Sequence, residues 1–166
     1  MSLALALLGT DAWTVGRVAW PGDPVDAATV HRCDGLRAVH PDAGWPLLVV
    51  HDGDSRHLSE GLVVHAREVV LHPSADGQWT VLTWDPPSCS QVSGTLELID
   101  DDGGSVEVEV WSGGAVVSAA LSGAGDAMTF ALPVGQSLSL FVGDGGDGFV
   151  DDSVRVALVA EGCVGL

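Results

Sequence analysis

Four aspartates close to the C-terminus are the residues whose spacing is most suited to chemistry. Asp144, Asp147, Asp151 and Asp152 fall within nine residues and are interspersed with glycines. Glycine allows left-handed backbone conformations, so several carboxylates can converge in one short loop. Carboxylates and loop carbonyls are the oxygen ligands that calcium prefers. We therefore expect a structural calcium ion on these four residues; the alternative is a solvated turn between two strands.

The tryptophans suggest a second chemistry, the binding of sugars. The chain has six tryptophans and no tyrosine. An indole can stack on the apolar face of a pyranose while nearby carboxylates accept hydrogen bonds from its hydroxyls. Trp45 and Trp84 lie near expected strand ends, and Asp85 follows Trp84 directly. We expect these three residues in a ligand site, although for any single tryptophan a place in the core is the alternative. Trp79 and Trp111 stand within apolar alternation and are expected in the core.

Other function classes find little support in the sequence. It contains no G-x-S-x-G, H-E-x-x-H or phosphate-loop motif, so we expect no enzyme. The formal net charge of −17 argues against partners such as nucleic acid and anionic membrane surfaces. The apolar run at residues 3–8 is too short to span a membrane, and we expect no membrane insertion.

Three cysteines, Cys33, Cys89 and Cys163, leave at least one thiol unpaired in a monomer. All three single pairings stay open at this stage. No CxxC or Cys/His pair has the spacing of a structural zinc site.

The elements that must position these residues are short strands. Apolar and polar residues alternate with a period of two in most of the chain, and turn residues recur every few positions. A hairpin is predicted between residues 95–99 and 106–111, across an Asp-Asp-Asp-Gly-Gly turn. About nine or ten such strands predict an all-β fold, an antiparallel β-sandwich or jelly roll, formed by residues 1–166 as one domain.

Three segments, in this order and spacing, resemble the NPCBM family, the novel putative carbohydrate-binding modules. They are residues 60–66 (EGLVVHA), 105–114 (SVEVEVWSGG) and 138–148 (LSLFVGDGGDG). The resemblance covers about residues 45–160. It implies a galactose-binding-like sandwich, a sugar site in the loops at one end, and often a structural calcium. His65 lies in the first of the three segments, where it is either a hydroxyl partner in the sugar site or a buried histidine bonded to a neighbouring backbone group or carboxylate. The family's His and Trp after the acidic loop are replaced here by other residues.

Two hypotheses follow. The first is a non-catalytic carbohydrate-binding module, located outside the cell, in the periplasm or at the cell surface, whose partner is a glycan with a galactose- or fucose-type terminus. The second is a structural or adhesion domain of the same fold, with a degenerate sugar site and a protein partner.

Overall fold

The computed structural model describes residues 13–24, 26–27, 30–33, 36–39, 48–51, 56–57, 63–65, 68–74, 77–85, 89–99, 103–134, 137–148 and 152–162. Outside these ranges lie Trp45, Asp151, Cys163 and the apolar run at residues 3–8. All regular structure in the described ranges is β-strand. No helix within these ranges is long and apolar enough to cross a membrane.

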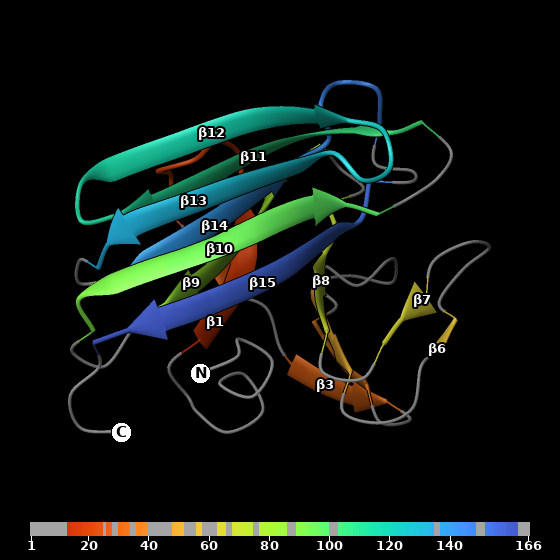
Figure 1. The fold of residues 1–166 in the computed structure, drawn as a ribbon. Coiled ribbons are helices and arrows are strands. Elements are labelled where there is room, and N and C mark those ends of the chain that lie inside the picture. Colours follow the sequence, from red (N-terminus) through yellow and green to blue (C-terminus); the bar gives the residue numbers. More distant parts are fainter. Residues whose placement is uncertain are drawn as a thin grey trace.

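Two antiparallel sheets form the body of the molecule (Figure 1). The six-stranded sheet has the order β12 (Ala115–Ser122), β11 (Ser105–Ser112), β14 (Leu138–Gly143), β9 (Trp79–Trp84), β1 (Trp13–Val18) and β2 (Asp26–Ala27). The seven-stranded sheet has the order β13 (Ala127–Pro133), β10 (Gln91–Leu98), β15 (Val154–Glu161), β8 (Val69–Leu71), β5 (Leu48–His51), β4 (Leu36–Val39) and β3 (Val30–Cys33). A separate small pair joins β6 (Arg56–His57) to β7 (Val63–Val64).

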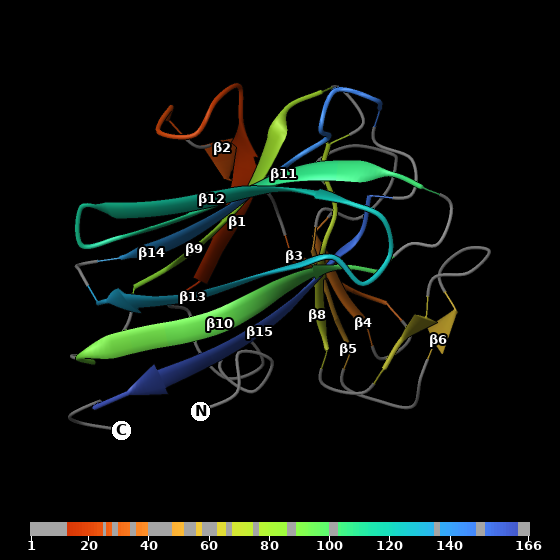
Figure 2. The same cartoon turned by 45° about the horizontal axis from the view of Figure 1, so that its top comes forward.

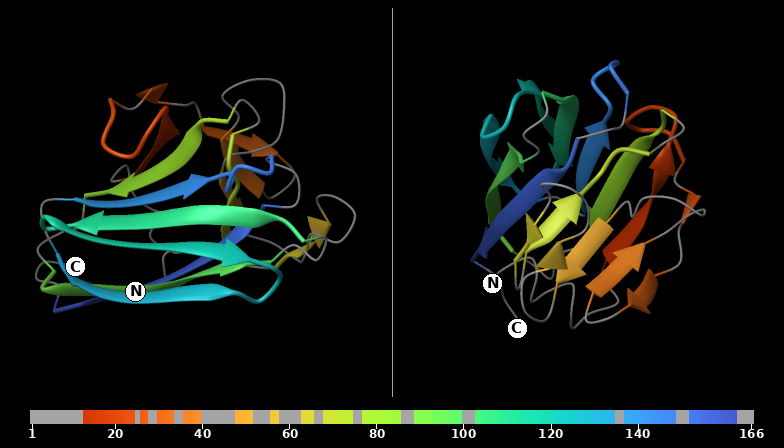
Figure 3. Two further views of the ribbon diagram at one scale, coloured as in Figure 1. Left: turned by 90° about the horizontal axis from the view of Figure 1, so that it is seen from above. Right: turned by 90° about the vertical axis from the view of Figure 1, so that its right-hand side faces the viewer.

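The main core lies between the two sheets, which stack in the views of Figures 2 and 3. Alternate residues of each strand point inward, as the period of two requires. The six-stranded sheet contributes Val15, Leu82, Val106, Val108, Val110, Leu138, Leu140 and Val142. The seven-stranded sheet contributes Val69, Leu71, Val92, Leu96, Leu98, Phe130, Val156 and Leu158. The predicted all-β antiparallel sandwich is therefore confirmed.

The predicted hairpin between residues 95–99 and 106–111 is wrong. β10 pairs with β13 and β15, whereas β11 pairs with β12 and β14 in the other sheet. Residues 99–104 are long enough to cross the roughly 10 Å between stacked sheets. The tight hairpin instead joins β11 to β12 through Gly113 and Gly114, whose φ angles of 58° and 81° suit a two-residue turn.

Cys89 precedes β10, is half-buried and is disulfide-bonded. Of the three pairings left open by the sequence, this excludes the one between Cys33 and Cys163.

Candidate functional site

A groove of about 360 Å³ lies on the outer face of the six-stranded sheet. This volume falls within the range of small-molecule sites, about 300–1,000 Å³. The strand register explains which side chains meet there. Glu107 on β11 stands opposite Ala120 on β12 and Gly143 on β14, and Glu109 stands opposite Ser118. The residues that line the groove are Trp79, Glu107, Val108, Glu109, Ser118, Ala119 and Ala120.

Trp79, the first residue of β9, forms an aromatic wall of this groove. It can lean over β14 because Gly143 has no side chain: a Cβ atom there would lie 2.7 Å from Cε2 of the indole. Trp79 is 7% exposed, so a ligand would touch the edge of its ring and not the whole face.

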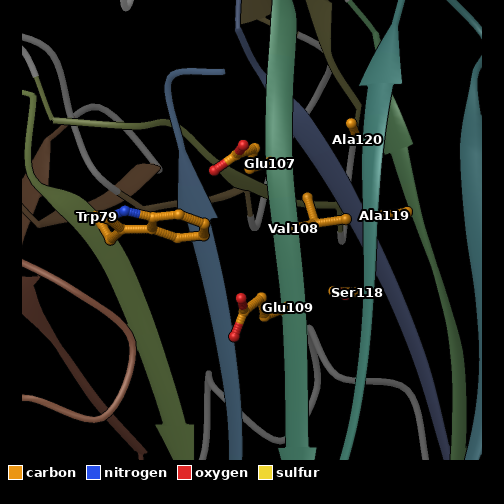
Figure 4. A pocket seen from close by; sticks show the side chains of 7 residues that line it. All are labelled: Trp79, Glu107, Val108, Glu109, Ser118, Ala119 and Ala120. Atoms are coloured by element: carbon orange, nitrogen blue, oxygen red, sulfur yellow. The ribbon is translucent and has the colours of Figure 1, made fainter. Parts of the chain in front are cut away.

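Two carboxylates stand across β14 from Trp79. Figure 4 shows both glutamate side chains pointing from β11 toward the indole. Trp111 Nε1 donates a hydrogen bond of 2.7 Å to Glu109 Oε2, which fixes that carboxylate. Glu107 is exposed at the mouth of the groove. No basic side chain is among the residues that line the groove, so the site offers hydrogen-bond acceptors and negative charge.

An apolar cluster next to the groove holds Trp79 in place. Trp79 packs with Val18, Val81 and Phe141 on the outer face of the sheet, and Trp111 packs against this cluster. The Trp111 and Phe141 ring centroids are 5.4 Å apart at a tilt of 56°, a favourable aromatic geometry. Trp79 and Trp111 are thus packed as predicted, but in a second cluster on the outer face of the sheet and not in the main core between the sheets.

The turn after β1 folds back over this cluster. Gly22 lies so close to Trp111 that a Cβ atom would be 3.1 Å from Cη2 of the indole. The turn is held by Trp20 N, which donates to Asp23 Oδ2 at 3.1 Å. Trp20 itself is 67% exposed, so an accessible indole face is carried by a loop on the same side of the sheet.

The acidic loop follows β14 and closes one end of this sheet. Asp144 Oδ1 accepts a hydrogen bond from Gly146 N at 3.1 Å, and Asp147 Oδ2 accepts one from Ser105 Oγ at 2.7 Å. Gly145 lies directly against Ser105, where a side chain would collide. These contacts dock the loop on the start of β11, two residues before Glu107.

The described part of this loop does not by itself form a calcium site. Calcium takes six to eight oxygen ligands, yet among the described residues no three His, Cys, Asp or Glu side chains converge in a way that could hold a metal. Asp152 is fully buried before β15, and Asp151 lies outside the described residues. Calcium therefore stays a prediction.

The four residues predicted for the sugar site are not brought together by the described structure. Trp84 is 4% exposed and packs in the main core, which corrects the expectation that its indole receives a sugar. Asp85 is exposed beyond the end of β9. Trp84 pairs with Leu138, the first residue of β14, whereas the acidic loop follows the last. Asp85 thus lies at the opposite end of the sheet from Asp144.

His65 is exposed and lies beside the seven-stranded sheet. Its backbone N donates to Glu68 Oε2 at 2.8 Å, and Arg155 bridges Glu68 Oε1 at 3.0 Å and Glu97 Oε2 at 3.1 Å. The segment around His65 is thereby tied to β15 and β10. Trp45, the fourth predicted residue, lies outside the described residues.

Glu107 and Glu109 were not expected in the site. Their outward direction follows from the alternation in β11, but their position beside Trp79 depends on β14 lying between β11 and β9. The strands that this order brings together are about 30 or more residues apart in the sequence, so no local sequence pattern predicts it.

No protein-family model matches the sequence, and no curated protein matches it. Among solved structures, the chain is similar to CBM51 from Clostridium perfringens GH95 in complex with methyl-galactose, with a TM-score of 0.51 and 14% identity over 95% of this chain and 99% of that one. The chain shares the fold of a carbohydrate-binding module. At this identity the likeness concerns the fold alone, a galactose-binding-like β-sandwich.

Two further likenesses are weaker. One is to the M60 catalytic domain with the CBM51-1 and CBM51-2 domains from Clostridium perfringens ZmpB, with a TM-score of 0.49, 17% identity and 63% of this chain covered; the chain spans 12% of the length of that protein. The other is to TmCBM61 in complex with beta-1,4-galactotriose, with a TM-score of 0.35, 13% identity, and 59% of this chain and 73% of that one covered.

Proposed function

We propose that this chain is a non-catalytic carbohydrate-binding module, a divergent relative of the NPCBM modules, whose sugar site is the groove on the six-stranded sheet. The observation that carries the proposal is the meeting of one aromatic wall, Trp79, with two carboxylates, Glu107 and Glu109, in a groove of pocket size. The sandwich fold shared with CBM51 over 95% of the chain supports it.

The chemistry of the groove suits a neutral hexose. Carboxylates accept hydrogen bonds from adjacent hydroxyls, and the ring edge of Trp79 offers apolar contact. A galactose- or fucose-type terminus is the proposed ligand; the similar CBM51 structure is a complex with methyl-galactose. Sugars that carry a carboxylate are expected to be rejected, because two glutamates line the groove and no basic residue does.

The same proposal includes a location outside the cell or at its surface, where glycans of this kind are met, and a structural calcium at the acidic loop. Binding is expected to be modest, with a Kd between about 10 µM and 1 mM, since one shallow site buries little area.

A glycan array followed by calorimetry with methyl galactoside tests the proposal. Both are run in calcium and again after chelation. The expected result is binding by the unaltered chain that is at least about tenfold weaker in Glu107→Gln, because the amide accepts hydroxyl hydrogen bonds less strongly than the carboxylate. Glu161→Gln is the matched control: Glu161 is also an exposed strand glutamate, but it lies at the end of β15 in the other sheet.

No sugar binding in either buffer by a folded sample would reject the proposal in favour of the structural or adhesion domain. Equal binding by the Glu107→Gln variant and the unaltered chain would show that the chain binds sugar at a site other than this groove.

A further inference from the structure

One lateral side of the sandwich is free of charged side chains over most of its length. The chain has six basic and 23 acidic residues, yet residues 110–143 contain a single charged side chain, Asp126. This segment includes β12 and β13, each of which forms one edge of its sheet among the described strands, and the two strands lie side by side. Figure 3 shows both strands along one border of the molecule, joined by a short turn. We call β12 and β13 the neutral edge.

The solvent-facing side chains of the neutral edge are all small or uncharged. On β12, Val116 is 52% exposed, which is high for a large apolar residue. The other exposed residues are Ser118, Ala120 and Ser122 on β12 and Ala127, Thr129, Ala131 and Pro133 on β13. A surface without carboxylates is unexpected in a chain with a net charge of −17, so its neutrality calls for a physical reason.

β12 is an edge strand without the usual protection. Among the described strands it pairs only with β11, in an uninterrupted ladder from Ser105–Ser122 to Ser112–Ala115. Natural sheets protect such edges with lysine, proline, inward-pointing charges or bulges. The eight residues of β12 contain no charge and no proline, and the ladder contains no bulge. The outer row of backbone N–H and C=O groups is thus suited to accept another strand.

We propose that the neutral edge is a dimer interface, in which β12 pairs antiparallel with β12 of a second copy of this chain. Charge identifies the partner. A basic partner would bind better to a surface that carries some of the 23 acidic residues. Two copies with a charge of −17 repel one another, and this repulsion is weakest where carboxylates are missing. An antiparallel pair of identical strands is also self-complementary, as a two-fold interface requires.

The symmetry of this pairing has a consequence for the sheet face. Antiparallel pairing of identical strands places the two-fold axis perpendicular to the sheet, so both copies present the same outer face. If the proposed function holds, two sugar grooves would lie on one continuous sheet, and a multivalent glycan could be bound with avidity. The dimer itself does not depend on sugar binding and is tested without it.

Sedimentation velocity from about 2 to 300 µM protein, with no sugar present, tests the interface, because a contact of one strand pair is small and a Kd of about 10–100 µM is expected. A pairing centred on Ala119 places Val116 of one copy opposite Ser122 of the other. The double variant Val116→Asp/Ser122→Asp therefore brings like charges together at both ends, and dimerisation should weaken at least about tenfold.

The matched control is Ala157→Asp/Val159→Asp. Both residues are exposed on β15, which is flanked by β10 and β8 and has no free edge, and Val159 is 50% exposed. This variant adds the same charge and should dimerise like the unaltered chain. Hydrogen exchange of residues 115–122 should also slow as the concentration of the unaltered chain rises.

Three results would overturn the proposal. The first is a monomer at every concentration, including in 0.5 M salt, where the screening length is about 4 Å. The others are equal dimerisation by the edge variant Val116→Asp/Ser122→Asp, and hydrogen exchange at residues 115–122 that does not depend on concentration. The exchange measurement decides the case if the edge variant fails to fold. Loss of sugar binding with an intact dimer would count against the proposed function alone.

Discussion

The indole of Trp79 lies against the backbone of Gly143, so closely that a Cβ atom at position 143 would stand 2.7, 2.9 and 3.0 Å from three of its ring carbons. The contact joins two neighbouring strands, β9 and β14, on the outer face of the sheet. It sets the direction in which the aromatic wall of the groove points, because any side chain at position 143 would push the ring away.

Gly143→Ala is expected to lower the free energy of unfolding by about 1–3 kcal/mol, the usual cost of inserting a methyl group into a filled space. Because Trp79 must move, its fluorescence and the near-ultraviolet circular dichroism should change as well. Urea denaturation measures the first effect. Val159→Ala, at a half-exposed strand position, should stay within about 0.5 kcal/mol. An unchanged spectrum in Gly143→Ala would contradict the contact.

Variants of His65 and Asp85 distinguish the groove from the sugar site that the sequence predicts in the loops. These residues contribute to sugar binding only if the loop site is correct. Both are exposed, and neither lines the groove. His65→Ala and Asp85→Asn should therefore leave the Kd for methyl galactoside unchanged within about twofold, whereas Glu107→Gln should weaken binding at least about tenfold. Titration calorimetry of the three variants compares them directly. A loss confined to His65→Ala would favour the loop site.

Local pattern was enough for the fold class but not for the site. Alternation around Trp79 and in residues 106–111 predicts strands that the structure contains as β9 and β11. It could not tell that β11 leaves the sheet of β10, because the choice of neighbour is made by packing between distant segments. The same limit applies to Trp84 and Trp79: which face of β9 meets the main core depends on the partner sheet.

Calcium at the acidic loop predicts a specific thermal effect. Suppose that calcium binds Asp144, Asp147, Asp151 and Asp152 in the folded chain only. A calcium concentration of 100 times the Kd then raises the free energy of unfolding by about 2.7 kcal/mol, which raises Tm by roughly 5–11 °C for a domain of this size. Scanning calorimetry with calcium, magnesium and a chelator measures this. Any divalent cation stabilises a chain with a net charge of −17 by screening its charges. A specific calcium site is therefore indicated only if Tm rises more in calcium than in magnesium.

Asp144→Asn should remove the calcium-specific rise, whereas Glu161→Gln, which lies outside the loop, should keep it. Equal Tm values in calcium and magnesium for the unaltered chain would identify the loop as a solvated turn. The turn is already held by the hydrogen bonds from Gly146 N to Asp144 and from Ser105 Oγ to Asp147.

The sheet order predicts the partner of Cys89. Cys33 ends β3, which is separated from β10 by β15, β8, β5 and β4, a distance of about 24 Å at the usual strand spacing. Disulfide-bonded cysteines have Cα atoms less than about 7 Å apart. Cys89 is disulfide-bonded, so Cys163 is the partner that remains. The register supports this, because Ser90 N donates to Glu161 O at 3.0 Å and Gly162 lies against Ser90.

Peptide mapping without reduction should therefore find a Cys89–Cys163 linkage, and one free thiol per chain, Cys33, should react in denaturant. Cys89→Ser should lower the free energy of unfolding by about 2–4 kcal/mol, because the bridge closes a long loop of the unfolded chain. Cys33→Ser is the control and should retain the linkage. A disulfide-linked peptide pair that contains Cys33 and Cys89 would contradict the strand order of the seven-stranded sheet, because four strands lie between β3 and β10.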